Sequence, residues 1–558
     1  MAETLFITTA IDYTNGAPHI GHAYEKILAD VIARYHRLKG DEVFFLTGVD
    51  QHGQKVQQSA EKQGIAPQQF VDQITAKFVA LWEKLDVRYD AWAATTDERH
   101  KQCVRGILQR LWDDKDETGE SRWIYKARQG GWYSVRQEQF LTDKERGEDG
   151  EFGPEWGHVE FREEENYYFR LANHRQWLLD LIEKRSAAGK PLVVPEFRVA
   201  ELRNAVEKLG GDLCISRPKE RLSWGIEFPF DPEFVTYVWF DALVNYISFA
   251  PGYDPAPARP PEPFLRWWRT ALHDIGKDIL IPAHGVYWPV MLKSLGFADN
   301  EMPTLLVHGW WNNSGEKMSK SLGNIVDPDA LADKYGAEAL RYYLMSDIST
   351  GKDSDFSEER LIQRYNTDLA NSLGNLLNRS LSMASKYREG TLMALSQADY
   401  ANLSEADQSF PSHVGSKVAL FRSLIEGVAG SSPTDPQRSD GFQFHDALSR
   451  GALAIASQCN EHVELTAPWK LAKDPAQSFR LDAVLYHLAE SLRIIAILIS
   501  PVLPKAAHGI FDQLNWKIEQ SGHNSRFTLA DAAWGGLSDG HVLGKPVPLF
   551  PRIEIPAT

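Results

Sequence analysis

The chain has 558 residues, too many for one hydrophobic core, and this length predicts roughly three to four domains. Its 43% hydrophobic and 24% charged residues are typical of a globular protein, whereas its formal net charge of −16 argues against a generally basic nucleic-acid-binding protein. Three scattered cysteines form no CxxC pair and no apolar run reaches membrane-spanning length, so the sequence predicts no disulfide framework, no thiolate metal site and no membrane span.

The first predicted unit is a strand, a loop and a helix. Residues 5–7 are apolar, Asn15-Gly16 predicts a turn, and His19-Ile20-Gly21-His22 opens a helical pattern that ends at Gly40. A helix start offers unpaired N–H groups and the positive end of the helix dipole, which favour phosphate, and Gly21 lets a flat purine approach the backbone. The alternative interpretation is a helix cap with two surface histidines, and this stretch alone leaves both open.

A second predicted strand, residues 43–48, completes a βαβ unit. Asp50 follows its carboxyl end, the position where doubly wound sheets bind ligands. The carboxylate is suited to pair with an ammonium group, and equally to form an Asx turn or a helix cap. Helical patterns over residues 67–84 and 98–115 complete the first half of this domain, which we place at residues 1–116.

Residues 117–224 are predicted to form an inserted domain, because glycines, a run of acids and many aromatic residues interrupt the preceding pattern. The parallel sheet is expected to resume near Phe234, in the second half of the domain at residues 225–326. Trp239, Ala242 and Tyr246 share one face if their segment is helical. Such a stripe is either a binding surface or plain core packing.

Two further stretches of this second half carry polar groups. Residues 275–284 are predicted to be a strand with a polar approach, in which Gly276 permits close contact and Asp278 is suited to accept hydrogen bonds from ribose hydroxyls. Residues 315–324 are predicted to be a loop that places Lys317 and Lys320 three residues apart, among glycines and serines. Together these lysines are suited to close over a triphosphate. For either lysine alone, the default interpretation is a solvated surface residue.

Beyond residue 327 the pattern is mainly helical, with a predicted linker at 327–365 and a helical domain at 366–558. Asn371, Asn375 and Arg379 recur every four residues and therefore share one side of a helix. Pro468 suits the first turn of a short helix that carries Trp469. Residues 360–388 contain five basic residues and one acidic residue, which permits a local basic face. Helices are predicted over 330–335, 337–345, 361–387, 445–465, 478–499 and 505–514, with a loop over 430–440.

The histidine stretch and the lysine stretch, in this order, resemble the paired signatures of class I aminoacyl-tRNA synthetases, and nearly the whole chain is similar to the methionyl-tRNA synthetase family. The resemblance implies an α/β fold with a doubly wound, Rossmann-like catalytic domain, an inserted connective domain and an α-helical anticodon-binding bundle. It also implies that methionine is activated with ATP to methionyl-adenylate and transferred to the 3′ end of tRNA(Met), for translation initiation and elongation. The expected cofactor is ATP with Mg²⁺, and the expected partners are tRNA(Met), methionine and ATP.

The resemblance also assigns roles to individual residues. The catalytic contacts to the triphosphate are His19, His22, Lys317 and Lys320, with Lys320 the first choice. The ATP-binding residues are His19, Gly21, His22, Gly276, Asp278 and Lys320. The methionine site is formed by Ile11, Tyr13, Asp50, Trp239, Ala242, Tyr246 and His284, where the separation of His284 from Ile279 is one residue longer than is usual in the family. The tRNA anticodon is read by Asn375, Arg379 and Trp469.

In this family the inserted domain often carries a zinc knuckle built on CxxC pairs, whereas here Ser134 and Gln137 stand where thiolates are expected. We therefore predict no metal site and no structural zinc, and expect His158 to be a surface or hydrogen-bonding histidine. Residues 1–4 lack the basic region of a signal peptide, so a cytoplasmic protein is expected. The end of the sequence shows no dimerisation domain, so a monomer is expected.

Three rival functions remain to be separated. Class I synthetases for isoleucine, valine or leucine usually carry a large editing insertion, for which residues 117–224 leave little room, and the cysteine enzyme resembles a metal-dependent selector. A non-acylating nucleotidyltransferase on the same fold would have no use for the helical half or Trp469. A tRNA-binding relative without catalysis is disfavoured by the intact histidines and lysines.

Overall fold

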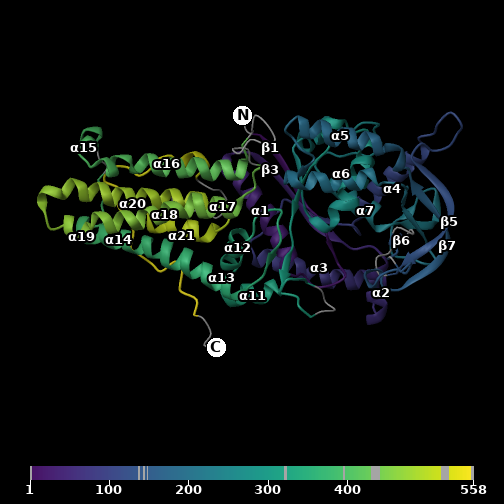
Figure 1. Cartoon of the computed structure of the whole chain (residues 1–558), viewed down its shortest axis with the longest axis horizontal. Helices are drawn as coiled ribbons and strands as arrows, with labels where there is room; N and C mark the ends of the chain where they lie inside the picture. The colour runs from purple at the N-terminus through teal and green to yellow at the C-terminus, as the bar shows by residue number, and fades with distance from the viewer. Residues whose placement is uncertain are drawn as a thin grey trace.

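The computed structural model describes residues 3–135, 139–141, 145–147, 149–318, 323–393, 396–428, 440–516 and 527–554. A parallel sheet lies in the middle of an elongated molecule, the antiparallel strands β5 to β7 lie at its right end in Figure 1, and a helical bundle forms its left end. The predicted α/β fold class is confirmed.

The central sheet has seven parallel strands. Their order is β2-β3-β1-β13-β14-β8, with β4 beside β3. Phe6 and Ile7 are fully buried, as expected for a strand that is covered on both faces. The strands are β1 Thr4–Thr9, β2 Asp12–Tyr13, β3 Glu42–Asp50, β4 Ala91–Ala94, β8 Val193–Val194, β13 Ala271–Gly276 and β14 Thr304–His308.

Helix α1 (Ile20–Lys39) begins and ends where the sequence predicts. His19 caps its first turn, and Gly40 ends it in the left-handed conformation, with φ of 100°. A side chain at Gly40 would be strained there, which explains the glycine. The other helices of this first half are α2 Gln54–Gln63, α3 Pro67–Lys84 and α4 Glu98–Asp113.

The region of the predicted insertion is built on a long antiparallel hairpin. Strands β5 (Ile124–Ser134) and β7 (Val159–Phe169) pair along their whole lengths. Strand β8 also lies within residues 117–224, yet it pairs with β14 of the central sheet. The domain limits therefore stay a prediction. The remaining elements here are β6 Gln139–Leu141, β9 Leu213–Cys214, β10 Ser216–Pro218, β11 Glu227–Phe228, β12 Asp231–Thr236, α5 Arg175–Ala187 and α6 Val199–Glu207.

Two expectations for the second half of the sheet were wrong. Phe234 belongs to β12, which pairs antiparallel with β10 and β11, and the chain returns to the parallel sheet at β13. Residues 275–284 are not one strand: β13 ends at Gly276, a 3₁₀ turn covers Lys277–Ile279, and π-type helix η6 covers Leu280–Tyr287. The β-branched residues favoured a strand, but Pro282 has no N–H to donate to a strand ladder.

The segment 238–248 is helical, as the spacing of Trp239, Ala242 and Tyr246 requires. Lys317 was expected in a loop but lies in the short strand β16, which pairs antiparallel with β15. Ser314 (φ 57°) and Gly315 (φ 78°) form the tight turn between them, a geometry that joins hairpin strands. The elements are α7 Val238–Leu243, α8 Asn245–Ser248, α9 Glu262–Trp268, α10 Trp288–Ser294, β15 Trp311–Asn313, β16 Glu316–Lys317 and β17 Ser354–Asp355.

The C-terminal part is a bundle of long helices, as predicted. The expected helix over 361–387 runs from Glu358 to Arg388, but its middle third, η8 (Tyr365–Gly374), has π-type hydrogen bonds. The predicted loop 430–440 lies outside the described residues except for Asp440. The helices are α11 Pro328–Tyr335, α12 Ala337–Ser346, α13 Glu358–Arg364, α14 Asn375–Arg388, α15 Gln397–Ala401, α16 Glu405–Glu426, α17 Phe444–Asp446, η9 Ala447–Ala452, α18 Leu453–Thr466, α19 Pro468–Leu471, α20 Ser478–Ile499 and α21 Pro504–Gln513.

One hydrophobic cluster runs from α1 into the bundle, through residues such as Ile27 and Leu492. At the junction, the fully buried Arg341 of α12 donates to Asp30 of α1 (2.7 Å) and to the carbonyls of Leu85, Pro501 and Val502. The sheet unit and the bundle are therefore joined by packed apolar side chains and by a buried ion pair. In the described parts of the chain, no helix has both the length and the apolar character that crossing a membrane requires.

Candidate active site

A cavity of about 730 Å³ opens at the carboxyl ends of the parallel strands. Every residue predicted for ATP or methionine binding lines it, apart from Lys320, which lies outside the described residues. The lining predicted residues are Ile11, Tyr13, His19, Gly21, His22, Asp50, Trp239, Ala242, Tyr246, Gly276, Asp278, His284 and Lys317.

The two histidines at the start of α1 cap each other. His19 Nδ1 accepts from Gly21 N–H, and His22 Nδ1 accepts from His19 N–H, both at 3.1 Å. Since each Nδ1 accepts a backbone proton, the proton on each ring lies on Nε2. A Cβ at Gly21 would come within 2.9 Å of the His19 ring, so this arrangement requires glycine. The helix start therefore carries two imidazole donors beside its own positive dipole end.

Asp278 lies between an indole and an ammonium group. Its carboxylate accepts from Trp310 Nε1 (3.2 Å) and from Lys317 Nζ (3.3 Å), and Lys317 Nζ also lies 3.9 Å from the Trp310 ring centre. Burial alone would raise the pKa of Asp278, but Lys317 and these hydrogen bonds outweigh it and lower the pKa. The group is therefore an ionised acceptor on the cavity wall.

His284 is a neutral, buried histidine whose tautomer is fixed by its partners. Nδ1 lies 2.9 Å from the Ile279 carbonyl and must donate to it, so Nε2 accepts from Tyr246 Oη at 2.7 Å. Burial lowers the pKa of His284 to about 4. The π-type turns of η6 hold more residues than α-turns, and His284 lines the cavity within them despite the long spacing from Ile279.

Asp50, at the end of β3, is buried at the cavity wall. One carboxylate oxygen accepts from His52 N–H (3.3 Å) and lies 3.4 Å from Thr95 Oγ1. This is the Asx-type contact that the sequence left open as an alternative. The Asx-type contact is compatible with the position of Asp50 on the cavity wall, because a carboxylate accepts more than one hydrogen bond.

The sequence missed a buried charge cluster on the cavity wall, which Asp12, Glu25 and His308 line. Lys26 Nζ contacts Asp12 (2.8 Å) and Glu25 (2.7 Å), and the other Glu25 oxygen lies 3.1 Å from His308 Nε2. Burial would lower the pKa of His308, but Glu25 and Asp274 outweigh it and raise the pKa to about 9. The only available signal was that Glu25 lies three residues after His22 on the same helix.

A second missed network holds the wall of the predicted methionine site. Asp241, fully buried on α7, accepts from His52 (2.7 Å) and His100 (2.8 Å). Burial would raise the pKa of Asp241, but the two histidines lower it to about 2. The three residues come from separate elements, so their spacing along the chain gave no signal.

The residues predicted to read the anticodon belong to α14 and α19, helices that Figure 1 draws toward the free end of the bundle, and none of them lines the cavity. Asn375 is exposed, and Arg379 pairs with Glu464 of α18 at 2.8 Å. The Trp469 side chain is 38% exposed and the nearby Leu465 is 77% exposed. An exposed aromatic and aliphatic surface beside polar groups is therefore available at this tip.

The positions expected for zinc ligands make no metal centre among the described residues. Ser134 Oγ donates to the Trp156 carbonyl at 2.5 Å, and Gln137 lies outside the described residues. His158 is exposed and lies 3.6 Å from Glu160. In the described ranges, no group of three or more His, Cys, Asp or Glu side chains is arranged to hold a metal ion. The absence of zinc stays a prediction.

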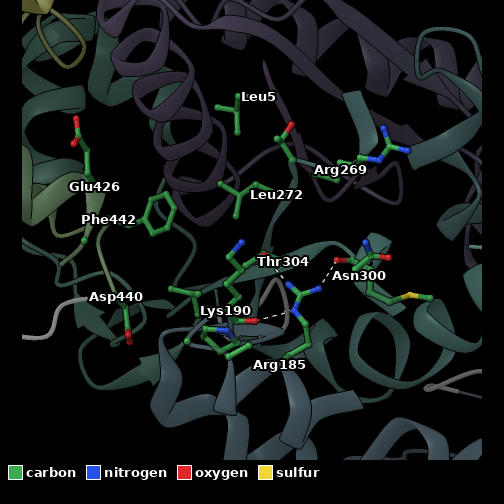
Figure 2. A pocket seen from close by; sticks show the side chains of 18 of the residues that line it. Leu5, Arg185, Lys190, Arg269, Leu272, Asn300, Thr304, Glu426, Asp440 and Phe442 are labelled. Atoms are coloured by element: carbon green, nitrogen blue, oxygen red, sulfur yellow. Dashed lines mark hydrogen bonds between the residues drawn. The ribbon is translucent and has the colours of Figure 1, made fainter. Parts of the chain in front are cut away.

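A second cavity, of about 1020 Å³, lies at the opposite edge of the sheet, near the starts of β1, β13 and β14 (Figure 2). Leu5, Leu272 and Thr304 face it from these strands, and Glu426 and Phe442 face it from the bundle side. None of the predicted site residues that the structure describes lines it. This cavity marks the junction between sheet and bundle, where Tyr35 Oη donates to Glu426 at 2.6 Å.

Comparison with known proteins agrees with this geometry. The family described as "tRNA synthetases class I (M)" matches residues 5–149 and 156–381. The methionine–tRNA ligase of Thermosynechococcus vestitus is 38% identical over 564 residues, covering 100% of this chain and 99% of that protein. The Bacillus subtilis methionine–tRNA ligase is 39% identical over 564 residues, covering 99% of this chain and 78% of that protein.

A solved structure shows the same architecture. The Mycobacterium tuberculosis methionyl-tRNA synthetase in complex with methionyl-adenylate superposes with a TM-score of 0.84 and is 34% identical, covering 99% of this chain and 100% of that chain. The sequence matches extend from the sheet through the insertion into the bundle, so they include both the cavity and the helical half. The chain therefore belongs to the class I tRNA synthetases, in the family of the methionine–tRNA ligases.

Proposed function

We propose that this chain activates methionine with ATP to methionyl-adenylate and transfers the methionyl group to the 3′ end of tRNA(Met), for translation initiation and elongation. The observation that carries the proposal is the single cavity lined by the α1 histidines, the Asp278–Lys317 pair and the Tyr246–His284 pair. The adenylate complex of the M. tuberculosis relative supports the same intermediate here.

In the first step, a methionine carboxylate oxygen attacks the α-phosphorus of ATP, and the bond to pyrophosphate breaks. No covalent enzyme intermediate is needed, so catalysis comes from positioning and from stabilising charge on the displaced phosphates. We assign the Nε2–H groups of His19 and His22, with the N-terminus of α1, to the triphosphate. Lys317 and Lys320 are assigned to the charge that develops on pyrophosphate.

The ribose is assigned to Gly276 and Asp278. Gly276 brings the backbone close to the ligand, and the ionised Asp278 accepts hydrogen bonds from the ribose hydroxyls. These hydroxyls compete with Lys317, which holds the same carboxylate at 3.3 Å. Ribose binding then directs Lys317 toward the phosphates.

Methionine is assigned to the slot between Ile11, Trp239, Ala242 and Tyr246, with its ammonium group on Asp50. The thioether is only a weak hydrogen-bond acceptor, so selectivity depends on close apolar walls, where one methylene is worth ~1–3 kcal/mol. A neutral His284 suits such a wall because it places no charge beside the thioether. Tyr13 and His284 complete this assigned set.

We assign the anticodon of tRNA(Met) to the tip of the bundle. The exposed ring of Trp469 is suited to stack on an unstacked base, and Asn375 and Arg379 are suited to bond base edges. The pairing of Arg379 with Glu464 orients its guanidinium on this surface. Mg²⁺ is assigned to ATP itself. A zinc-free insertion, a monomer, a cytoplasmic location and the domain limits given above complete the proposal.

Pyrophosphate exchange tests the proposed function. ATP–pyrophosphate exchange measured with each standard amino acid is expected to be fast with methionine and near background with isoleucine, valine, leucine and cysteine. Charging of tRNA(Met) transcripts with methionine is expected in the same preparation. Exchange that favours another amino acid, or exchange without charging, would reject the proposal in favour of one of its rivals.

A further inference from the structure

One side chain of the inserted region reaches the active-site cavity. Among the described residues that line this cavity, Trp156 is the only one from residues 117–224. It lies in the short 3₁₀ turn Pro154–Trp156, between the two strands of the β5–β7 hairpin, and is half-buried. The predicted ATP and methionine sites assign it no role.

The position of Trp156 is fixed by the hairpin. Its carbonyl accepts from the fully buried Ser134 Oγ at 2.5 Å, and its N–H donates to Gly153 at 3.1 Å. Val135 N–H also donates to the His158 carbonyl, two residues after the indole. Ser134 stands where a metal-binding thiolate was expected, so a hydroxyl–carbonyl bond holds the turn that carries the indole.

A second unassigned group on the cavity wall is Lys55, in the first turn of α2. Its ammonium group has no ion pair or hydrogen bond within the described part of the chain. The start of α2 also contacts the inserted region: Gln57 Oε1 accepts from Ser223 N–H at 3.1 Å, and Gln54 Oε1 lies 3.4 Å from Arg221. A cation on α2 and an aromatic ring of the inserted region thus line the same cavity.

The second step of the proposed reaction requires a third ligand in this cavity. A terminal ribose hydroxyl of tRNA must attack the carbonyl carbon of the adenylate, and its oxygen forms the new ester bond. The bond between that carbon and the phosphate oxygen breaks, AMP leaves with the electron pair, and the hydroxyl proton passes to solvent. A nucleotide presents a flat base and an anionic phosphate. Indole and ammonium groups are the side chains suited to these two features.

We propose that Trp156 and Lys55 form a subsite for the 3′-terminal nucleotide of tRNA, with the indole stacked on the base and the ammonium group on a phosphate. The proposal rests on the proposed function, since it supplies the acceptor for the methionyl group. It also gives the inserted region a direct part in the transfer step.

The test separates transfer from activation. With adenylate formed beforehand on the full chain, Trp156→Ala is expected to raise the tRNA concentration for half-maximal single-turnover transfer by roughly 5- to 150-fold, the range for losing one base–aromatic stack. Trp156→Phe retains a ring and is expected to stay near wild type. Methionine-dependent pyrophosphate exchange is expected to be unchanged in both. Trp132→Ala, in the same hairpin but away from the cavity, is the matched control.

Truncated tRNA distinguishes stacking from a structural role. Trp156→Ala is expected to weaken binding of a transcript that ends in CCA, and to leave binding of a transcript that lacks the terminal adenosine unchanged. Lys55→Ala is expected to reduce the slope of log binding constant against log salt by about 0.7, the value for one phosphate of a single strand. Lys62→Ala, on the same helix and outside the cavity, is expected to retain the slope.

Three results would overturn the subsite: an equal fall in pyrophosphate exchange, equal weakening of both transcripts, or no change in transfer and salt slope. Failure of the proposed function looks different, because wild-type protein would then show no methionine-dependent exchange. Lys55→Ala alters only the side chain of a partly exposed residue, so its result remains informative if Trp156→Ala does not fold.

Discussion

Lys317 and Lys320 are the two ammonium groups that we assign to the charge on the displaced pyrophosphate. Lys317 lies on the cavity wall beside Asp278. Lys320 lies outside the described residues, so its role rests on the motif. The sequence could not show that Lys317 is held by a carboxylate and an indole, because Asp278 lies 39 residues away along the chain and Trp310 approaches Lys317 only through the turn between β15 and β16.

Replacing Lys320 by Ala is expected to slow adenylate formation by ~3 kcal/mol in activation free energy, the magnitude for one preorganised charge contact. Methionine binding is expected to change little, because the charge acts on the phosphates. Rapid-quench measurement of the first turnover checks this. Lys334→Ala, which removes an exposed lysine paired with Glu358, serves as the control. An unchanged first turnover would remove Lys320 from the proposed chemistry.

Replacing Tyr246 by Phe removes only the hydroxyl that donates to His284 Nε2. The ring, stacked on His273 with centroids 4.2 Å apart, is retained. A buried acceptor without its donor costs ~1–3 kcal/mol, so the KM for methionine is expected to rise by roughly 5- to 150-fold while the KM for ATP stays constant. Pyrophosphate exchange with each substrate varied in turn measures both. Tyr253→Phe, outside the cavity lining, is the control, and a parallel rise in both KM values would contradict the assignment.

At the scale of elements, periodicity predicted helices well and the partners of strands poorly. Helices α3 and α20 occupy the predicted ranges, because a sustained helical pattern depends only on local sequence. The pattern around Phe234 correctly indicated a strand, but alternation does not say which strand it pairs with, and β12 joined a separate antiparallel sheet. The two residues of β8 are too few for any period.

Helix α19 gives the element-scale prediction for tRNA. Trp469→Ala removes an exposed ring from the first turn of this helix and is expected to weaken tRNA(Met) charging by ~1–3 kcal/mol, the value of one stacked base. Pyrophosphate exchange is expected to stay intact, since no residue of α19 lines the cavity. Charging kinetics with a varied tRNA concentration measure the effect. A matching loss in both assays would assign Trp469 to folding instead of the anticodon.

Helix α20 buries a histidine that makes the bundle sensitive to acid. Burial lowers the pKa of His487 to about 3. Its Nδ1 lies 3.5 Å from His462 Nε2, and its Nε2 lies 2.9 Å from the Tyr400 hydroxyl. An unfolded histidine titrates near pH 6.5, so below this pH the unfolded chain binds a proton that the native chain refuses. Stability that is present above pH 6.5 is therefore lost as the pH falls toward 3, by ~1.4 kcal/mol per pH unit for one site.

The variant His487→Asn removes this titration. Its unfolding midpoint in urea, followed by circular dichroism from pH 7.5 to pH 5, is expected to fall less steeply with acid than that of wild type. His158→Asn, which alters an exposed histidine, is expected to retain the wild-type slope. Equal slopes in the wild type and His487→Asn would show that other groups set the acid sensitivity.

For the whole molecule, the fold class and the order of its parts followed from the sequence, because the change from mixed to helical patterning near residue 327 is a long-range feature of composition. The way the parts are joined did not follow. The junction depends on Arg341, which looked like an ordinary helical arginine and yet is fully buried, and on the contact of Tyr35 with Glu426. The partners in Arg341–Asp30 and in Tyr35–Glu426 are hundreds of residues apart, so no local sequence pattern predicts either contact.

Arg341→Met tests whether this junction couples the sheet unit to the bundle. The guanidinium has two roles, as the counter-ion of Asp30 and as donor to carbonyls that follow α3 and α20. Burial lowers the pKa of Arg341 although Asp30 opposes it, as expected for a cation held in the interior. Methionine fills similar volume but leaves the buried Asp30 with Arg34 as its ion partner and the Arg88 N–H as a backbone donor, and removing one partner of a buried pair costs ~3–5 kcal/mol.

Because that cost falls at the boundary between the two parts, calorimetry of the variant is expected to show an earlier unfolding transition separated from a later one, and calorimetry of the wild type is expected to show a single transition. Adding Asp30→Asn to Arg341→Met is expected to recover part of the loss, since it removes a buried charge that has lost one of its two ion partners. Arg360→Met is the matched control, because this arginine is exposed, its partner Asp347 keeps a second pair with Arg364, and solvent-exposed pairs contribute only ~0–1 kcal/mol. If Arg341→Met shifts the transition no more than Arg360→Met does, the apolar cluster alone joins the two halves.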